Sequence, residues 1–210
     1  MMASGESCPN LSPRLRVLPM RATMPGVTLD DDEAVRRMKS GDIGGLEILV
    51  RRYQVRAVRA AFLVTQDEPL AEDVVQDAFL HLHQRIHHFD DRRPLEPYLM
   101  RSVINGALNA MRRERKSTSL DAAPGPLERR LQTASVETEV EIAEQAREVL
   151  HALSQLPPRQ RAVIAQRYYL EWSEQEMAQA LEAPPGTIKW LLHAARLRLR
   201  ELLGSGRSTP

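Results

Sequence analysis

Cysteine and aromatic residues are scarce in this 210-residue chain, and their scarcity excludes several classes of protein. Cys8 is the only cysteine, so the fold can contain no intramolecular disulfide framework, which fits a reducing cytoplasm. Aromatic residues make up 4% of the chain, while leucine, alanine, arginine and glutamate dominate. This composition favours helices over sheets and predicts an all-α protein.

Membrane-spanning and catalytic motifs are also missing. No run approaches the roughly 18 apolar residues of a membrane span, and the N-terminal stretch lacks the apolar core of a secretory signal. Without a Gly-rich phosphate loop or a nucleophile elbow, we expect neither an enzyme nor a bound cofactor or small-molecule substrate. His83 and His87 have a spacing that can hold zinc, but no thiolate or HExxH base accompanies them, so we expect no metal site.

Charge and proline content divide the chain into two basic helical blocks. The net charge is only +1, but residues 33–116 carry 15 Lys and Arg against 12 Asp and Glu, and residues 146–203 carry 8 against 6. Residues 117–145 carry 2 against 6 and include the prolines and small residues of a linker. We therefore predict two helical domains joined by a flexible linker. The predicted parts are a disordered tail over 1–28, a first domain over 29–116, an acidic linker leading into a helix over 117–145, a helix-turn-helix domain over 146–203 and a tail over 204–210.

A helix predicted over residues 71–89 has an apolar stripe and a separate polar face. Its apolar stripe is predicted to pack into the core and consists of Val74, Val75, Ala78, Phe79 and Leu82. On the other face Asp73, Gln76, Asp77 and Leu80 follow one another at i, i+3, i+4 and i+7. This face is either ordinary solvated surface or a docking face, because short polar groups around one exposed leucine suit a protein partner better than catalysis.

A second helix, predicted over residues 98–116, combines a core side with a side typical of nucleic-acid binding. The predicted core side consists of Leu99, Val103, Ala107, Leu108 and Met111. The other side carries Arg101, Asn105, Asn109, Arg112 and Lys116 at steps of three or four residues. Such side chains can donate hydrogen bonds to base edges and phosphates. Two asparagines inside a helix lower its intrinsic helix propensity with no evident local gain. Nucleic-acid contact is therefore favoured over a plain solvated face.

The C-terminal block has the elements of a helix-turn-helix. Ser173 and Glu176 form a predicted capping box before a short helix, and Pro185 opens the last helix. Such a second helix enters the major groove with its first residues at the bases. Its predicted core seam is Ile188, Leu192, Ala195, Leu199 and Leu202. Its exposed early part is predicted to hold Thr187, Lys189, Trp190 and His193, and its outward face to be partly apolar through Trp190, Leu191, Ala194 and Leu197.

In this order the pieces resemble a bacterial RNA polymerase sigma factor of the sigma-70 family, in its small extracytoplasmic-function group. The resemblance covers roughly residues 33–116, the family's region 2, and 146–203, its region 4. The segments that carry it are AEDVVQDAFLHLH, RRPLEPYLMRSVINGALNAMRRERK and ALSQLPPRQRAVIAQRYYLEWSEQEMAQAL. Agreement over two separated blocks is more specific than a single helix-turn-helix match.

The resemblance assigns expected roles to individual residues. It implies that Asp73, Gln76 and Asp77, with Leu80 beside them, dock on the β′ clamp helices of the polymerase. Residues 89–97 would capture a base flipped out of the opening duplex. The residues expected to contact the promoter −10 element are Arg101, Asn105, Asn109, Arg112 and Arg113. Those expected to contact the −35 element are Thr187, Lys189, Trp190, His193 and Arg196.

The resemblance also implies partners and a location. The expected partners are core polymerase, through its β′ clamp helices and β flap, promoter DNA and an anti-sigma factor. The protein is expected in the cytoplasm, and on the nucleoid when bound to polymerase. It would position two promoter-reading domains on the polymerase surface, while the polymerase performs the chemistry.

Some residues depart from the family pattern. Tyr98 stands where a tryptophan is usual and is expected in the core. The turn LEAPP lacks its common glycine, and Pro184 replaces the usual serine cap of the last helix, at a cost of about 1 kcal/mol. Because the last helix has an apolar outward face, the alternative is a sigma-like regulator whose second domain binds a protein instead of DNA. A plain helix-turn-helix repressor would leave the first domain unexplained.

Overall fold

The structure, a computed structural model, describes residues 30–117 and 137–205, and its regular elements there are all helical, as predicted. The predicted tail over 1–28, residues 206–210 of the predicted C-terminal tail and most of the predicted linker lie outside the described residues. Gly204 and Ser205, predicted in that tail, belong instead to the last helix, which ends at Ser205. No helix in these two ranges combines the length with the apolar run needed to cross a bilayer.

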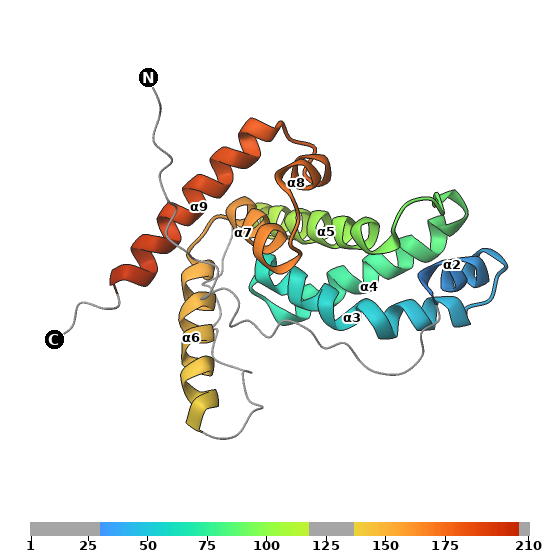
Figure 1. Cartoon of the computed structure of the whole chain (residues 1–210), viewed down its shortest axis with the longest axis horizontal. Helices are drawn as coiled ribbons and strands as arrows, with labels where there is room; N and C mark the ends of the chain where they lie inside the picture. The colour runs from blue at the N-terminus through green and yellow to red at the C-terminus, as the bar shows by residue number, and fades with distance from the viewer. Residues whose placement is uncertain (1–29, 118–136, 206–210) are drawn as a thin grey trace.

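Four α-helices and one short 3-10 helix form the first domain. They are α2 (Asp31–Lys39), α3 (Gly44–Thr65), α4 (Glu68–Arg85), η1 (Ile86–His88) and α5 (Leu95–Ser117). The three long helices α3, α4 and α5 pack against one another, and α2 crosses the end of this bundle that is remote from the second domain (Figure 1). The predicted apolar stripe of α4 is buried along its whole length, which confirms that prediction.

A helix cap, one close backbone approach and two side-chain hydrogen bonds fix how neighbouring helices of the first domain are connected. Asp67 caps α4 by accepting a hydrogen bond from the Leu70 amide at 2.8 Å. Between α2 and α3 the backbones approach so closely that a Cβ on Gly45 would lie 2.3 Å from the Ala34 carbonyl oxygen. Asp31 accepts hydrogen bonds from Tyr53 and Arg52, which fastens the start of α2 to α3. The α2 helix therefore has a fixed position at the end of the bundle.

The second domain contains α6 (Glu137–Ser154), α7 (Pro158–Ile164), η3 (Ala165–Tyr169), α8 (Glu174–Ala180) and α9 (Pro185–Ser205). Helix α7 is continued directly by one π-helical turn, η3. The predicted capping box is present, with the Ser173 hydroxyl and the Glu176 carboxylate each bonding the other's backbone N–H. Helix α9 packs against α6, α7 and α8, and its predicted seam faces that core.

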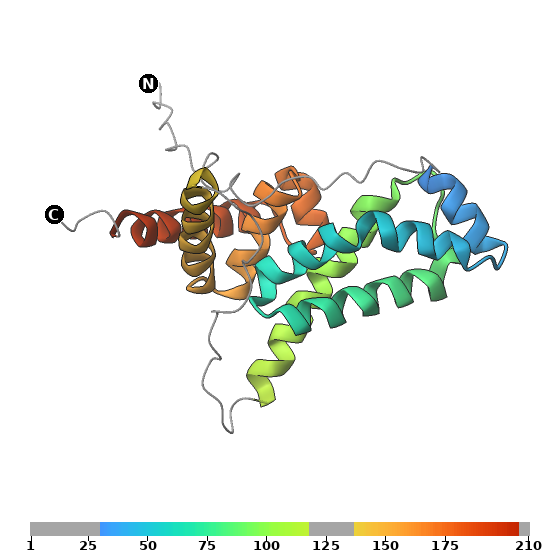
Figure 2. The ribbon, with the colours of Figure 1, turned by 90° about the horizontal axis from the view of Figure 1, so that it is seen from below.

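The two domains touch each other directly. Helix α7 and turn η3 pack on α3, and α7 also contacts α5. Figure 2 shows α7 between the bundle and α9 when the molecule is seen from below. Leu63 of α3 and Leu153 of α6 line one pocket together with residues of α7 and η3, so the buried apolar surface continues from one domain into the other.

Candidate functional site

The polar face of α4 is fully available to a partner. Asp73, Gln76 and Asp77 are exposed, and Leu80 beside them is 46% exposed. No hydrogen bond or ion pair joins the three polar side chains to any other described residue. The face is therefore a row of two carboxylates and one amide around one leucine. It is held rigidly because the opposite side of the helix is packed into the bundle.

Helix α5 presents its asparagines and arginines on one side, as predicted. Arg112 donates a hydrogen bond from Nη2 to Asn109 Oδ1 at 3.0 Å, and both residues are exposed. Arg113 is also exposed, and the side chain of Lys116 lies outside the described residues. The C-terminal half of α5 thus carries cationic donors and one preoriented amide, which suits phosphates and base edges.

The N-terminal half of the same face is not free. Arg101 Nη2 lies 2.9 Å from Glu182 Oε1, and Asn105 Nδ2 donates a hydrogen bond to the Ala180 carbonyl oxygen at 3.0 Å. Ala180 ends α8, and Glu182 lies in the turn between α8 and α9. Two residues predicted to contact DNA are therefore in contact with the helix-turn-helix of the second domain.

The loop before α5 differs from the prediction in length and in the position of one aromatic residue. Leu95, Glu96 and Pro97 form the first turn of α5, so the loop ends at residue 94 instead of 97. Tyr98, predicted in the core, is 39% exposed and meets the buried Phe89 edge to face, with ring centres 5.1 Å apart. The prediction for Tyr98 was wrong because position 98 lies on the same side of α5 as Arg101, three residues later, whereas the buried Leu95 and Leu99 form the side that faces the core.

A lysine of α2 fastens this loop. Lys39 Nζ donates hydrogen bonds to the Phe89 carbonyl oxygen at 2.9 Å and to Asp91 Oδ1 at 2.6 Å. Asp90 accepts from the Arg92 amide at 3.1 Å, which tightens the turn further. No local sequence motif marks Lys39, because its partners lie about 50 residues along the chain. The loop is thus held on α2 as well as by its own turn.

The start of α9 carries the exposed residues that the sequence predicted. Lys189, Trp190 and His193 are exposed, and Thr187 is half-buried. Lys189 Nζ lies 4.0 Å from Glu174 Oε2, at the limit of an ion pair. Trp190 is 64% exposed, and no described residue stacks on its indole ring. This end of α9 is accessible but carries little positive charge.

Two other residues of α9 are held inside the domain. Leu191, predicted on the outward face, is buried, because α9 is covered by neighbours on more than one side. Arg196 donates from Nε to the Tyr168 hydroxyl oxygen at 3.0 Å, and its guanidinium lies 5.8 Å from the ring centre. The outward apolar face therefore consists of Trp190, Ala194 and Leu197, of which Leu197 is 46% exposed.

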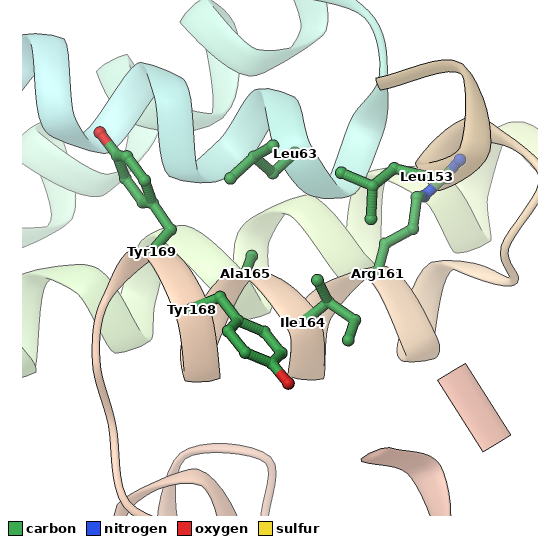
Figure 3. A pocket seen from close by; sticks show the side chains of 7 residues that line it. All are labelled: Leu63, Leu153, Arg161, Ile164, Ala165, Tyr168 and Tyr169. Atoms are coloured by element: carbon green, nitrogen blue, oxygen red, sulfur yellow. The ribbon is translucent and has the colours of Figure 1, made fainter. Parts of the chain in front are cut away.

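The contact between the domains buries an arginine without full pairing. Arg161 lines the pocket beside Leu63, Leu153, Ile164, Ala165, Tyr168 and Tyr169 (Figure 3). Its Nε atom is buried with no hydrogen-bond partner, and Nη1 reaches the Ser154 carbonyl oxygen only at 3.5 Å. Burial, and then the positive charge of Arg115, lower the pKa of Arg161 to about 10. This part of the interface is therefore electrostatically unfavourable.

The histidines do not gather into a metal site. His83 lies in the last turn of α4 and His87 in η1, and both are exposed. In the parts of the chain that the structure describes, no three His, Cys, Asp or Glu side chains lie as metal ligands would.

Comparisons with known proteins agree with the two-domain arrangement. The family profile described as Sigma-70 region 2 matches residues 49–117, and the profile described as Sigma-70, region 4 matches residues 146–199. The RNA polymerase sigma-E factor of Streptomyces avermitilis is 32% identical over 168 residues, which are 80% of this chain and 90% of that protein. The ECF RNA polymerase sigma factor SigW of Bacillus subtilis is 26% identical over 80% of this chain and 94% of its own length.

Solved structures share the fold. One is CnrH in complex with the cytosolic domain of CnrY, with a TM-score of 0.57 and 24% identity over 83% of this chain and 97% of that one. Another is the sigma factor RpoE in complex with the anti-sigma factor NepR from Bartonella quintana. It has a TM-score of 0.57 and 21% identity, and the match covers 81% of this chain and 99% of that one. At these identities the likeness concerns the fold alone.

Proposed function

Because this chain belongs to the sigma-70 family of RNA polymerase sigma factors, as a member of its extracytoplasmic-function group, we propose that it divides polymerase docking and promoter recognition among three helical faces. A sigma factor directs transcription initiation at specific promoters and is not an enzyme. The proposal concerns which surfaces of this chain do that work. The domain limits proposed for it are residues 29–116 for region 2 and 146–203 for region 4.

The α4 face is the proposed contact with polymerase. Asp73, Gln76, Asp77 and Leu80 are exposed on a helix whose other side is rigidly packed, and they would bind the β′ clamp helices. The second domain would add a contact with the β flap. A preformed polar face with one apolar anchor binds with little loss of conformational entropy.

The α5 face and its preceding loop are the proposed −10 reader. Asn109, Arg112 and Arg113 are accessible, and Arg101 and Asn105 continue the same row. Donors of this kind hold phosphates and base edges, while the loop fastened by Lys39 would receive the unpaired base. Capture of the open strand would favour duplex opening without any chemistry by this chain.

The start of α9 is the proposed −35 reader, through Thr187, Lys189, Trp190 and His193. Its apolar Trp190, Ala194 and Leu197 can touch thymine methyl groups but supply no phosphate contacts. This observation also favours a second candidate for this face, in which α9 binds a protein. Arg196 would support α9 from within the domain, because it is bonded to Tyr168.

The chain is proposed to act in the cytoplasm and on the nucleoid, under the control of an anti-sigma factor. Two structures that share its fold were solved with regulatory chains bound, the cytosolic domain of CnrY and the anti-sigma factor NepR. Such a partner would cover the same helical faces and exclude polymerase or promoter.

The observation that carries the proposal is that α4 and α5 present separate faces, one polar with an exposed leucine and one rich in asparagine and arginine. The experiment measures core-polymerase affinity and open-complex formation for two sets of variants. Asp73→Ala with Gln76→Ala should weaken core binding, whereas Asn105→Ala and Asn109→Ala should lower open-complex formation with core affinity unchanged. Gln54→Ala, an exposed change on α3, is the matched control. Unchanged core affinity in the α4 double variant contradicts the docking assignment.

A further inference from the structure

The first half of α9 contains no arginine. Between Pro185 and Ala195 the only residue with a permanent positive charge is Lys189. Arginine is the side chain that most often selects guanine, because its planar guanidinium can pair with O6 and N7 of that base together. The base-reading positions of a recognition helix lie in its first turns. This helix therefore enters the major groove without the usual reader of guanine.

Lys189 lies at one side of the proposed reading surface. Its Nζ atom is 4.0 Å from Glu174 Oε2 of α8, and Figure 1 shows the beginning of α9 next to α8. Successive residues of a helix are about 100° apart around its axis, so Lys189 points away from the direction of Trp190. A cation at the side of a recognition helix meets the phosphates along the groove before it meets the base edges. Lys189 thus supplies a phosphate contact instead of base selection.

The arginines of α9 also lie outside the reading surface. Arg196 is held by Tyr168, through a 3.0 Å hydrogen bond from Nε and a distance of 5.8 Å between guanidinium and ring centre. Arg198 and Arg200 are exposed, but they lie about 16 Å or more beyond Thr187 along the helix axis. Because the major groove is about 12 Å wide, a helix with its first turns at the bases carries these two arginines past the base edges.

Apolar side chains occupy the outward positions instead. Trp190, Ala194 and Leu197 form one row at i, i+4 and i+7, about 10 Å long. The first and last of them are exposed, and Ala194 is half-buried. Thymine is the standard base whose major-groove edge carries a methyl group, at C5. An apolar row in this groove therefore gains more free energy from thymine than from any other standard base.

The two remaining side chains at the start of α9 do not restore a preference for guanine. His193 is exposed, but a neutral imidazole has one N–H donor, whereas the pair of bonds that selects guanine needs two. Thr187 carries a hydroxyl that can bond to any base acceptor and a methyl group that can contact thymine. Both residues accept guanine, and neither selects it.

We propose that the −35 element of this chain is recognised through thymine methyl groups, with Trp190 and Ala194 as the residues that determine specificity. This inference rests on the proposed −35 role of α9 and names the bases that α9 selects. Because base pairs are about 3.4 Å apart, a row about 10 Å long spans about three successive steps. The element therefore contains two or more thymines, on either strand, within about four consecutive base pairs.

Selection from a duplex library identifies the selected bases. Core polymerase reconstituted with this full chain binds duplexes randomised over the −35 region, upstream of the −10 element of a promoter mapped with the same holoenzyme. The bound fraction is then sequenced. It should be enriched in neighbouring thymines, with no required guanine. An enriched element dominated by guanine overturns the proposal while leaving the −35 role of α9 intact.

Deoxyuridine in place of thymidine tests the methyl groups themselves, because uracil keeps the base pairing and the O4 acceptor and lacks only the C5-methyl group. Each critical replacement should lower the affinity of the holoenzyme for the selected duplex about fourfold, the effect expected for one buried methyl group. Trp190→Ala should abolish this thymine preference at one position or more, whereas Trp190→Phe, which keeps an apolar ring, should retain it. Lys189→Ala is the control: it should bind less tightly but keep the full preference.

The outcomes separate this inference from the proposed function. Equal affinity of the unaltered holoenzyme for thymine and uracil duplexes overturns the proposal, and so does a preference that Lys189→Ala loses together with Trp190→Ala. A −35 region without any enriched sequence, next to a −10 element that is still required, removes the −35 role itself and favours a protein partner for α9. A thymine preference that Trp190→Ala loses and Lys189→Ala keeps supports the proposal.

Discussion

Arg196 of α9 is bonded to Tyr168 of η3, with the guanidinium Nε 3.0 Å from the phenol oxygen and the charge 5.8 Å from the ring centre. Arg196→Ala should lower the free energy of unfolding of the second domain by about 1–2 kcal/mol, because it removes a hydrogen bond and a cation–π contact together. Chemical denaturation followed by tryptophan fluorescence measures this, since Trp172 and Trp190 both lie in that domain.

Lys189→Ala, on the same helix as Arg196, should affect DNA binding instead of stability. Its side chain is 69% exposed, so stability should change by less than about 0.5 kcal/mol. Promoter binding by the holoenzyme should weaken. The plot of log affinity against log salt concentration should become less steep, by the amount expected for the loss of about one phosphate contact. An unchanged slope for Lys189→Ala would mean that this lysine does not meet the DNA backbone.

The apolar face of α9 separates DNA recognition from protein recognition. Trp190→Ala with Leu197→Ala should leave the fold intact, because Trp190 is 64% and Leu197 46% exposed. If α9 reads the −35 element, promoter affinity should fall about tenfold with the salt slope unchanged, since apolar contacts release no counterions. Unaltered promoter affinity in this double variant would instead favour a protein partner for the face.

Acidification should weaken the capping box of α8. The Ser173 hydroxyl and backbone N–H both donate to the Glu176 carboxylate and hold its pKa below the ordinary value of 4.5. A lowered pKa in the folded state means that the carboxylate stabilises the fold above about pH 4.5, and that this contribution is lost as the pH falls through the folded value. The melting temperatures of the wild type and of Glu176→Gln should therefore converge at acid pH.

Glu148→Gln is the control for that pH series. Glu148 is an exposed residue of α6 and forms no capping box, so its substitution should leave the pH dependence of melting unchanged. A difference in melting temperature between the wild type and Glu176→Gln that stays the same at every pH would contradict the role given to the capping box.

The amphipathic period of the sequence was enough to identify α4 and the polar rows on α4 and α5. The same period wrongly predicted Leu191 on the outward face of α9. Leu191 is buried next to Leu192, because neighbouring helices cover α9 on more than one side. The sequence pattern also placed the start of α5 three residues late, at Tyr98, since proline at position 97 reads as a turn signal although it lies in the first helical turn. The ion pair between Arg101 and Glu182 could not be predicted, because no local pattern relates residues of different domains.

Lys39 provides a test of the loop before α5. Lys39→Met keeps the aliphatic stem but removes the bonds to the Phe89 carbonyl and to Asp91. Open-complex formation should slow roughly fivefold, equivalent to about 1 kcal/mol, while core-polymerase affinity stays the same. Arg36→Met, on the same helix but bonded only to Asp32 and Glu33, should have no effect on opening.

The central claim is that this chain directs polymerase to specific promoters through the faces of α4 and α5. The most direct measurement is in-vitro transcription by core polymerase reconstituted with this chain, on a pool of genomic fragments from its source, with transcript starts mapped by sequencing. The account predicts starts at a defined set of sites that share −35 and −10 elements, and their loss with Asn105→Ala and Asn109→Ala. Tight binding to core polymerase without any chain-dependent start sites would contradict it.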